Sequence, residues 1–383
     1  MKRAVEFASV VVCAMSMQGC LCHGDRTGVD LSPRAIAAAE AAGCKATAGE
    51  ELRIYTWSDY IAPEVIAGFE NGLGVKVVID TFDSNEDMYA SLKADGVKYD
   101  IMMPSSYQIA QMVNDGMIDE LDGAKCPNLL KNFDKSYACQ VVDPSFWYNA
   151  PYAVTYTGFM YLKSKIPQGA DANSLSILGN PALSGRIILL DDMREVIGIG
   201  LISLGYSVNS TNPREIDAAV AQVLKWRRNI SKFDAESYKA EVPSGASWLG
   251  QGYSSDIMQV IVGSADAGDH PNNDVGFSLP KEGFTITFDE MVIAKNSKHK
   301  DLAYAFINYI YDGEVAKANM ERICCINPVK PGIDALEPKY RALIIPDDAT
   351  IRRGQLIRGF ADDPEAMELY NKAWSKIKAA EGR

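Results

Sequence analysis

The stretch Leu52-Arg-Ile-Tyr-Thr-Trp-Ser-Asp-Tyr60 decides the fold class of this chain. Residues 52–57 have the pattern of a short β-strand, and a helical pattern begins soon afterwards at Pro63. Two aromatic rings and a carboxylate therefore lie where the strand ends. A buried strand end has no need of a charge, whereas a partly apolar cation would suit rings and a carboxylate together. The stretch predicts a β–α unit whose strand end contributes to a ligand site.

The same alternation of strand and helix continues along the chain. Strands are predicted at residues 75–79 and 99–103, and helices at 63–71, 85–94 and 106–115. A second series has strands at 153–161 and 185–190 and helices at 195–205, 213–230, 302–311 and 365–379. Strands that alternate with helices imply mostly parallel sheets covered on both faces. We therefore expect an α/β protein with two lobes and a small-molecule site between them.

The composition is that of a soluble globular protein long enough for two domains. The chain has 383 residues, of which 47% are hydrophobic and 23% charged. Its formal net charge of −12 argues against nucleic acid as a partner, because phosphate binding favours a basic surface. The same charge is compatible with a cationic ligand.

The N-terminus has the pattern of an export signal. Met1-Lys-Arg3 is basic, residues 5–17 are largely apolar, and Gly19 is a small residue at the expected cleavage site. Cys20 resembles the lipidated cysteine of bacterial lipoproteins; the alternative is an ordinary cleaved signal followed by a chance cysteine. We expect a signal peptide over residues 1–19 and a tether over residues 20–50. No later apolar run is long enough to span a bilayer.

Export would permit disulfide bonds. Six cysteines remain outside the signal and the lipidation position, and they allow 15 pairings. Cys126 and Cys139 flank a loop-like segment, so a bridge between them is the favoured pairing. No C-x-x-C spacing occurs, and neither a metal site nor a cofactor is expected.

Motifs for nucleophilic or phosphate chemistry are absent from the sequence. The three histidines, His23, His270 and His299, lie in polar, loop-like contexts, and no phosphate-binding loop pattern occurs. The pair Gly198 and Gly200 lacks the third glycine of a dinucleotide-binding turn. We do not expect an enzyme, although one that uses only carboxylates stays open.

Several stretches together resemble one family of binding proteins. They are Tyr55-Thr-Trp-Ser-Asp-Tyr-Ile-Ala-Pro63, Phe82-Asp-Ser-Asn-Glu86, Tyr99-Asp-Ile-Met-Met-Pro-Ser-Ser-Tyr107, Leu190-Asp-Asp-Met-Arg-Glu-Val196, Asn209-Ser-Thr-Asn-Pro213, Pro280-Lys-Glu-Gly283 and Phe288-Asp289. In this order the chain is similar, from about residue 50 to its end, to the periplasmic spermidine/putrescine-binding proteins. These are the solute receptors of bacterial polyamine ABC transporters.

The resemblance implies a two-lobed periplasmic-binding-protein fold of type II. Each lobe would be a mostly parallel sheet flanked by helices, with the ligand cleft between the lobes. Lobe 1 would contain residues 51–153 and 286–330, and lobe 2 residues 154–285 and 331–383. A hinge would close the lobes over the ligand.

The resemblance also implies a set of ligand-binding residues. Matched position by position, they are Trp57, Ser58, Asp59, Tyr60, Ser105, Tyr107, Asp192, Glu195, Trp248 and Asp289. A polyamine is an alkyl chain with ammonium groups, so it needs carboxylates at set separations and flat apolar walls between them. A hydrogen bond to a charged group contributes about 1.5–3 kcal/mol, and an aromatic face under a cation about 0.5–2 kcal/mol. The alternatives are core tryptophans, a helix cap at Asp59 and a solvated turn at Asp192 and Glu195.

Three positions depart from the family pattern and leave the choice of polyamine open. Thr287 and Cys325 stand where the family has aromatic residues, so one end of the site would be looser, or Phe284, Phe288 or another ring would supply the missing wall. Gln251, three residues after Trp248, stands where the putrescine-binding branch has an aspartate. Other stretches favour each branch in turn, with a slight preference for putrescine over spermidine.

We therefore expect an exported, monomeric, lipid-anchored receptor that delivers a polyamine to a membrane permease driven by a cytoplasmic ATPase. It would act outside the cytoplasm and touch the membrane only through Cys20. The alternatives are the same fold with another organic cation, an amino acid or a metal complex, and a surface lipoprotein that acts as an adhesin.

Overall fold

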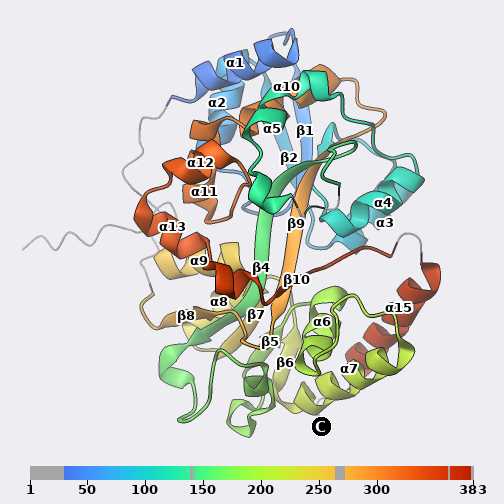
Figure 1. Ribbon diagram of the computed structural model, residues 1–383, viewed down its shortest axis with the longest axis vertical. Coiled ribbons are helices and arrows are strands. Elements are labelled where there is room, and N and C mark those ends of the chain that lie inside the picture. Colours follow the sequence, from blue (N-terminus) through green and yellow to red (C-terminus); the bar gives the residue numbers. More distant parts are fainter. Residues whose placement is uncertain (1–29, 139–140, 142, 264–271, 361–362, 381–383) are drawn as a thin grey trace, which may run out of the picture.

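A computed structural model describes residues 30–138, 141, 143–263, 272–360 and 363–380 (Figure 1). The expected signal peptide and Cys20 lie outside these residues, so both stay predictions. In the described ranges, every helix is too short or too polar to cross a bilayer.

The helices begin mostly at proline or at a capping side chain, as the sequence predicts. Their bounds are α1 Ser32–Ala42, α2 Pro63–Leu73, α3 Asn85–Asp95, α4 Ser106–Asn114, α5 Pro127–Asn132, α6 Met193–Ser203, α7 Pro213–Trp226, α8 Tyr238–Ser244, α9 Ser254–Val262, α10 Lys300–Ile310, α11 Gly313–Ile323, α12 Lys330–Ala335, α13 Pro338–Ile344, α14 Asp348–Ile351 and α15 Pro364–Ala379.

The strands are short except for two. Their bounds are β1 Glu51–Thr56, β2 Lys76–Thr81, β3 Ile101–Met102, β4 Ala150–Leu162, β5 Ile187–Leu189, β6 Ile230–Phe233, β7 Leu249–Tyr253, β8 Val275–Ser278, β9 Phe284–Ile293 and β10 Gly354–Leu356. The long strands β4 and β9 consist almost entirely of buried residues.

One curled sheet runs through the molecule in the order β2-β1-β3-β9-β4-β7-β5-β6, with β10 beside β9 and β8 beside β4. At one end β1 pairs in parallel with β2 and β3, and at the other β5 pairs in parallel with β6 and β7. The antiparallel pair of β4 and β9 joins the two parallel parts (Figure 1). The predicted two-lobed α/β fold with crossing strands is confirmed.

Each parallel part has its own hydrophobic core. The first contains side chains of β1, α2, α10 and α11, and the second contains those of α6, α7 and α15. Ile333 and Ile344 pack in the first core, whereas Ile357 and Tyr370 pack in the second. The last part of the expected lobe 2 thus joins the second core only from about residue 357. The lobe boundaries themselves stay predictions.

The expected tether is corrected for residues 31–50, which are part of the folded body. The buried residues of this segment are Leu31, Ala35, Ala38, Ala39 and Ala42. Their spacing places them on one face of α1, which packs on α2 and α10. Gly72 of α2 permits the close approach, because a Cβ atom there would lie 2.5 Å from the carbonyl oxygen of Ser32. An alanine-rich composition suggests a linker, but the periodicity is that of a packed helix.

The expected bridge between Cys126 and Cys139 is not shown. Cys126 is fully buried and has no disulfide partner among the described residues, and burial raises the pKa of its thiol to about 12. Cys139 lies outside the described residues, so the pairing stays a prediction.

The packing of α1 can be tested by placing a charge on either face. Ala35 is 0% exposed and Ile36 is 45% exposed. We expect Ala35→Asp to lower the free energy of unfolding by about 2 kcal/mol or more, because it buries an unpaired carboxylate. Ile36→Asp should leave it nearly unchanged. Equal denaturant midpoints for the two variants would show that α1 does not pack as described.

Candidate functional site

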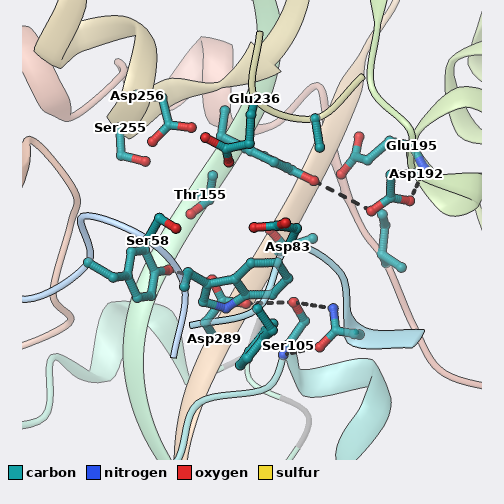
Figure 2. A pocket seen from close by; sticks show the side chains of 18 of the residues that line it. Ser58, Asp83, Ser105, Thr155, Asp192, Glu195, Glu236, Ser255, Asp256 and Asp289 are labelled. Atoms are coloured by element: carbon teal, nitrogen blue, oxygen red, sulfur yellow. Dashed lines mark hydrogen bonds between the residues drawn. The ribbon is translucent and has the colours of Figure 1, made fainter. Parts of the chain in front are cut away.

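A cavity with a volume of about 60 Å³ lies between the two parallel parts of the sheet. Its walls come from loops after β1, β2 and β3, from the start of α6, from α8 and the end of β7, and from the crossing strands β4 and β9. Figure 2 shows carboxylates and hydroxyls around it from the loops after β1, β2 and β3, from the starts of α6 and α9, from the segment before α8 and from the crossing strands. Loops at the carboxyl ends of parallel strands are where open α/β folds bind ligands.

Most of the residues selected from the sequence meet at this cavity. Those that line it are Trp57, Ser58, Tyr60, Ser105, Tyr107, Asp192, Glu195 and Asp289. Asp59 and Trp248 do not line it. Asp59 has a left-handed backbone (φ 54°) and borders a neighbouring hollow, and the N-cap of α2 is Ala62, so the helix-cap alternative for Asp59 is wrong.

Asp289 lies at the floor of the cavity on β9 and is 6% exposed. A β-bridge joins it to Ser105, whose Oγ donates a hydrogen bond of 2.6 Å to its carboxylate. The hydroxyl of Tyr60 donates a second hydrogen bond to the same carboxylate. Burial raises the pKa of Asp289 to about 6, although both hydrogen bonds oppose this shift. Asp289 is therefore oriented by two hydroxyls and has no basic partner among the described residues.

Asn85 organises the lobe 1 side and is a site residue that the sequence alone does not reveal. Its Nδ2 donates to Ser105 Oγ at 3.0 Å and to the hydroxyl of Tyr107 at 2.8 Å. Its Oδ1 accepts from the backbone N–H of Ser105 at 2.9 Å. In the sequence Asn85 belongs to a family stretch but has the pattern of a helix cap. The N-cap is instead Ser84, whose side chain accepts from the backbone N–H of Asp87.

Asp192 and Glu195 lie at the N-terminus of α6, on the lobe 2 side. Asp192 caps the helix by accepting hydrogen bonds from the backbone N–H groups of Arg194 and Glu195 at 2.8 and 3.0 Å. It also accepts a hydrogen bond of 3.4 Å from the hydroxyl of Tyr253. Burial raises its pKa. The solvated-turn alternative is wrong, since Glu195 is 1% exposed.

Glu195 lies against two threonine hydroxyls. Its Oε2 accepts from Thr285 Oγ1 at 2.5 Å. Its Oε1 is buried and makes no hydrogen bond of standard geometry with the described residues, although the hydroxyl of Thr157 lies close enough to lower the pKa of Glu195. Burial, followed by the charge of Asp192, outweighs both threonines and raises this pKa to about 8. A buried carboxyl group with so few donors around it is suited to receive a donor from a ligand.

Trp248, the residue expected to stack on the ligand, does not line the cavity, whereas Tyr253 does. Trp248 lies outside the cavity, with the guanidinium of Arg186 at 5.0 Å and the ammonium of Lys165 at 5.7 Å from its ring centroid. Tyr253 lines the cavity, and Asp256, three residues later, lines it as well. The ring-x-x-aspartate spacing that Trp248 and Gln251 lacked is therefore present five residues farther on.

The missing aromatic walls are replaced on the lobe 1 side. Phe82 lines the cavity and packs on Trp57 with ring centroids 4.5 Å apart. Phe284 and Phe288, the expected substitutes, are buried in the core and do not line the cavity. Thr287 lines it without a ring.

Comparisons with known proteins agree with this geometry. Residues 64–343 match the family model of bacterial extracellular solute-binding proteins. This chain belongs to that family. It is 31% identical to the putrescine/cadaverine-binding protein of Pseudomonas aeruginosa, over 90% of this chain and 98% of that protein. It is also 31% identical to the spermidine/putrescine-binding periplasmic protein of Escherichia coli, over 86% of this chain and 91% of that protein.

The fold comparison gives the same result. A solved structure described as a putative spermidine/putrescine ABC transporter from Listeria monocytogenes has a TM-score of 0.78 and 29% identity, over 86% of this chain and 99% of that chain. The resemblance drawn from the sequence is thus confirmed. The matched family and relatives are solute-binding proteins and not enzymes.

The raised pKa of Glu195 predicts how stability depends on pH in the ligand-free solute-binding protein. The folded state holds this proton up to pH about 8, whereas the unfolded state loses it near the ordinary pKa of 4.5. Between these values the folded state binds more protons, so the free energy of unfolding falls as pH rises, by up to about 1.4 kcal/mol per unit. We expect Glu195→Gln to remove this part of the slope in urea unfolding at pH 5 to 8. The exposed substitution Glu40→Gln is the control, and a slope unchanged by Glu195→Gln would contradict the assignment.

Proposed function

We propose that this chain is an extracytoplasmic receptor for a polyamine, putrescine or spermidine, that delivers its ligand to an ABC uptake transporter. The observation that carries this proposal is the set of buried carboxylates around a cavity with aromatic walls. Asp289, Asp192 and Glu195 accept hydrogen bonds from hydroxyls and backbone N–H groups, and none forms an ion pair among the described residues. The charge of Arg194 acts on Asp192 and Glu195 without such a pair. A ligand with ammonium groups would supply the cations that directly contact these carboxylates.

The distribution of these groups suits an alkyl chain with charged ends. Asp289 and Ser105 lie on one side of the cavity in Figure 2, and Asp192 and Glu195 on another. Trp57, Phe82 and Tyr253 supply apolar faces for the methylene groups between two ammonium ends. Two ammonium–carboxylate contacts with a packed chain are compatible with micromolar affinity, about −8 kcal/mol.

Binding would also close the lobes. Ser105 and Asp192 belong to different parallel parts of the sheet, so a ligand between them contacts both lobes only in the closed form. A ligand that makes more contacts in one state favours that state. Closure then presents a loaded receptor to the permease.

The names of the relatives support this ligand class. The Pseudomonas aeruginosa and Escherichia coli proteins are described as putrescine/cadaverine-binding and spermidine/putrescine-binding.

The same proposal includes three features that rest on the sequence. They are export by the signal over residues 1–19, lipid anchoring through Cys20 and a monomeric state. Delivery to permease subunits driven by a cytoplasmic ATPase rests on the family.

Calorimetric titration of the chain from residue 21 onward, stripped of bound amine by unfolding and refolding, tests the proposal. We expect one-to-one micromolar or tighter binding of putrescine or spermidine. Asp289→Ala should weaken it by about ten- to hundredfold, since one charge-assisted contact is lost. Asp217→Ala is the matched control, because Asp217 is an exposed carboxylate paired with Lys376.

The outcomes separate the alternatives. No heat with any amine, from protein shown to be folded and empty, would refute the polyamine function. Binding that does not depend on Asp289 would favour another ligand in the same fold. Saturable binding to a host or matrix protein that ignores amines would favour an adhesin.

A further inference from the structure

One basic side chain lies in a cavity whose other charged side chains, among the described residues, are all acidic. Among the described residues that line the cavity, Lys239 of α8 is the only lysine or arginine. Its Nζ lies 2.5 Å from Oε2 of Glu236, and 23% of the side chain is exposed. A protein ammonium group therefore lies at the wall of a site proposed to hold ligand ammonium groups.

The surroundings of Lys239 keep it charged. Burial alone would lower its pKa, but the carboxylates of Asp256, Glu236 and Asp59 outweigh burial and raise the pKa above the usual value. Asp256 also accepts a hydrogen bond of 2.7 Å from the hydroxyl of Tyr238. The acids at this end of the cavity are thus already supplied with a cation and a donor.

The carboxyl groups at the opposite end of the cavity have different surroundings. Figure 2 shows Glu236 and Asp256 on one side of the cavity and Asp192 and Glu195 well apart from them on the other. At that other side Asp192 and Glu195 accept hydrogen bonds from hydroxyls and backbone N–H groups, and Asp289 at the floor accepts them from the hydroxyls of Tyr60 and Ser105. None of these three carboxyl groups forms an ion pair with a lysine or arginine of the described residues.

We propose that Lys239 takes the place of a ligand ammonium beside Glu236 and Asp256, so that the site selects amines with two ammonium groups over amines with three. This inference rests on the proposed function and specifies its ligand. A diamine places its ends at Asp289 and at the Asp192 and Glu195 pair. A triamine brings a third charge, which Lys239 repels because like charges at short range disfavour each other.

The test measures the ratio of the putrescine and spermidine dissociation constants by calorimetry at one pH and salt concentration. The unmodified receptor should bind putrescine more tightly. Lys239→Met should shift the ratio toward spermidine by about tenfold or more, because it removes the charge and leaves Glu236 and Asp256 unpaired. Lys239→Gln should shift it in the same direction, and Lys239→Arg, which keeps the charge, should preserve the preference for the diamine.

Lys232→Met is the matched control. Lys232 forms a similar pair with Glu241, with Nζ and Oε1 2.6 Å apart, but does not line the cavity, so the ratio should not change. An unchanged ratio in both neutral Lys239 variants, or tighter spermidine binding by the unmodified receptor, overturns the inference and leaves the proposed function standing. A folded, amine-free receptor that binds neither amine overturns both.

Discussion

The antiparallel pairing of β4 with β9 is the constraint on which the rest of the structure depends. Both strands pass through the two lobes, and all ten residues of β9 are buried. Thr155 faces Thr287 in this ladder, and Ala153 faces Asp289. Three of these four residues line the cavity, so the strands that join the two lobes also form the floor of the site. A ligand at Asp289 would therefore lie where the lobes meet, with side chains of both lobes at the same cavity.

This placement has an electrostatic cost. Carboxyl groups buried at the cavity lose hydration, and burial raises the pKa of Asp289 on β9 to about 6 and that of Glu195 on α6 to about 8. At neutral pH the empty site thus keeps Glu195 protonated, and a bound ammonium would favour release of that proton. In the proposed function, binding a cation would relieve the unfavourable environment of both acids. The same relief would make closure around a cation more favourable than closure around a neutral solute.

Local patterns predicted the fold class, and the resemblance to a family supplied the site residues. Strand alternation and proline at helix starts indicated an α/β protein, whereas Trp57, Ser105 and Asp192 were matched to family positions, and all three line one cavity. Features that depend on long-range packing were missed. Asn85 has the sequence environment of a helix cap, and only the fold brings Ser105 and Tyr107 to its side chain. Residues 31–42 resemble a linker in composition, although the burial of Leu31 and Ala35 agrees with helical periodicity.

The positions of Trp248 and Tyr253 show that the place of a ring along its strand, more than the type of ring, decides whether it lines the cavity. Trp248 is the larger and more expected aromatic, but it directly precedes β7, whereas Tyr253 ends that strand. Since β7 runs parallel to β5, their carboxyl ends lie at the same edge of the sheet, and β5 leads directly to Asp192. Five residues of strand separate the two rings by roughly 16 Å, so the ring before the strand lies too far from Asp192 to share a ligand with it. In a parallel sheet the residues at and just beyond the carboxyl end of a strand contact the ligand, and this criterion alone selects Tyr253 and, three residues later, Asp256.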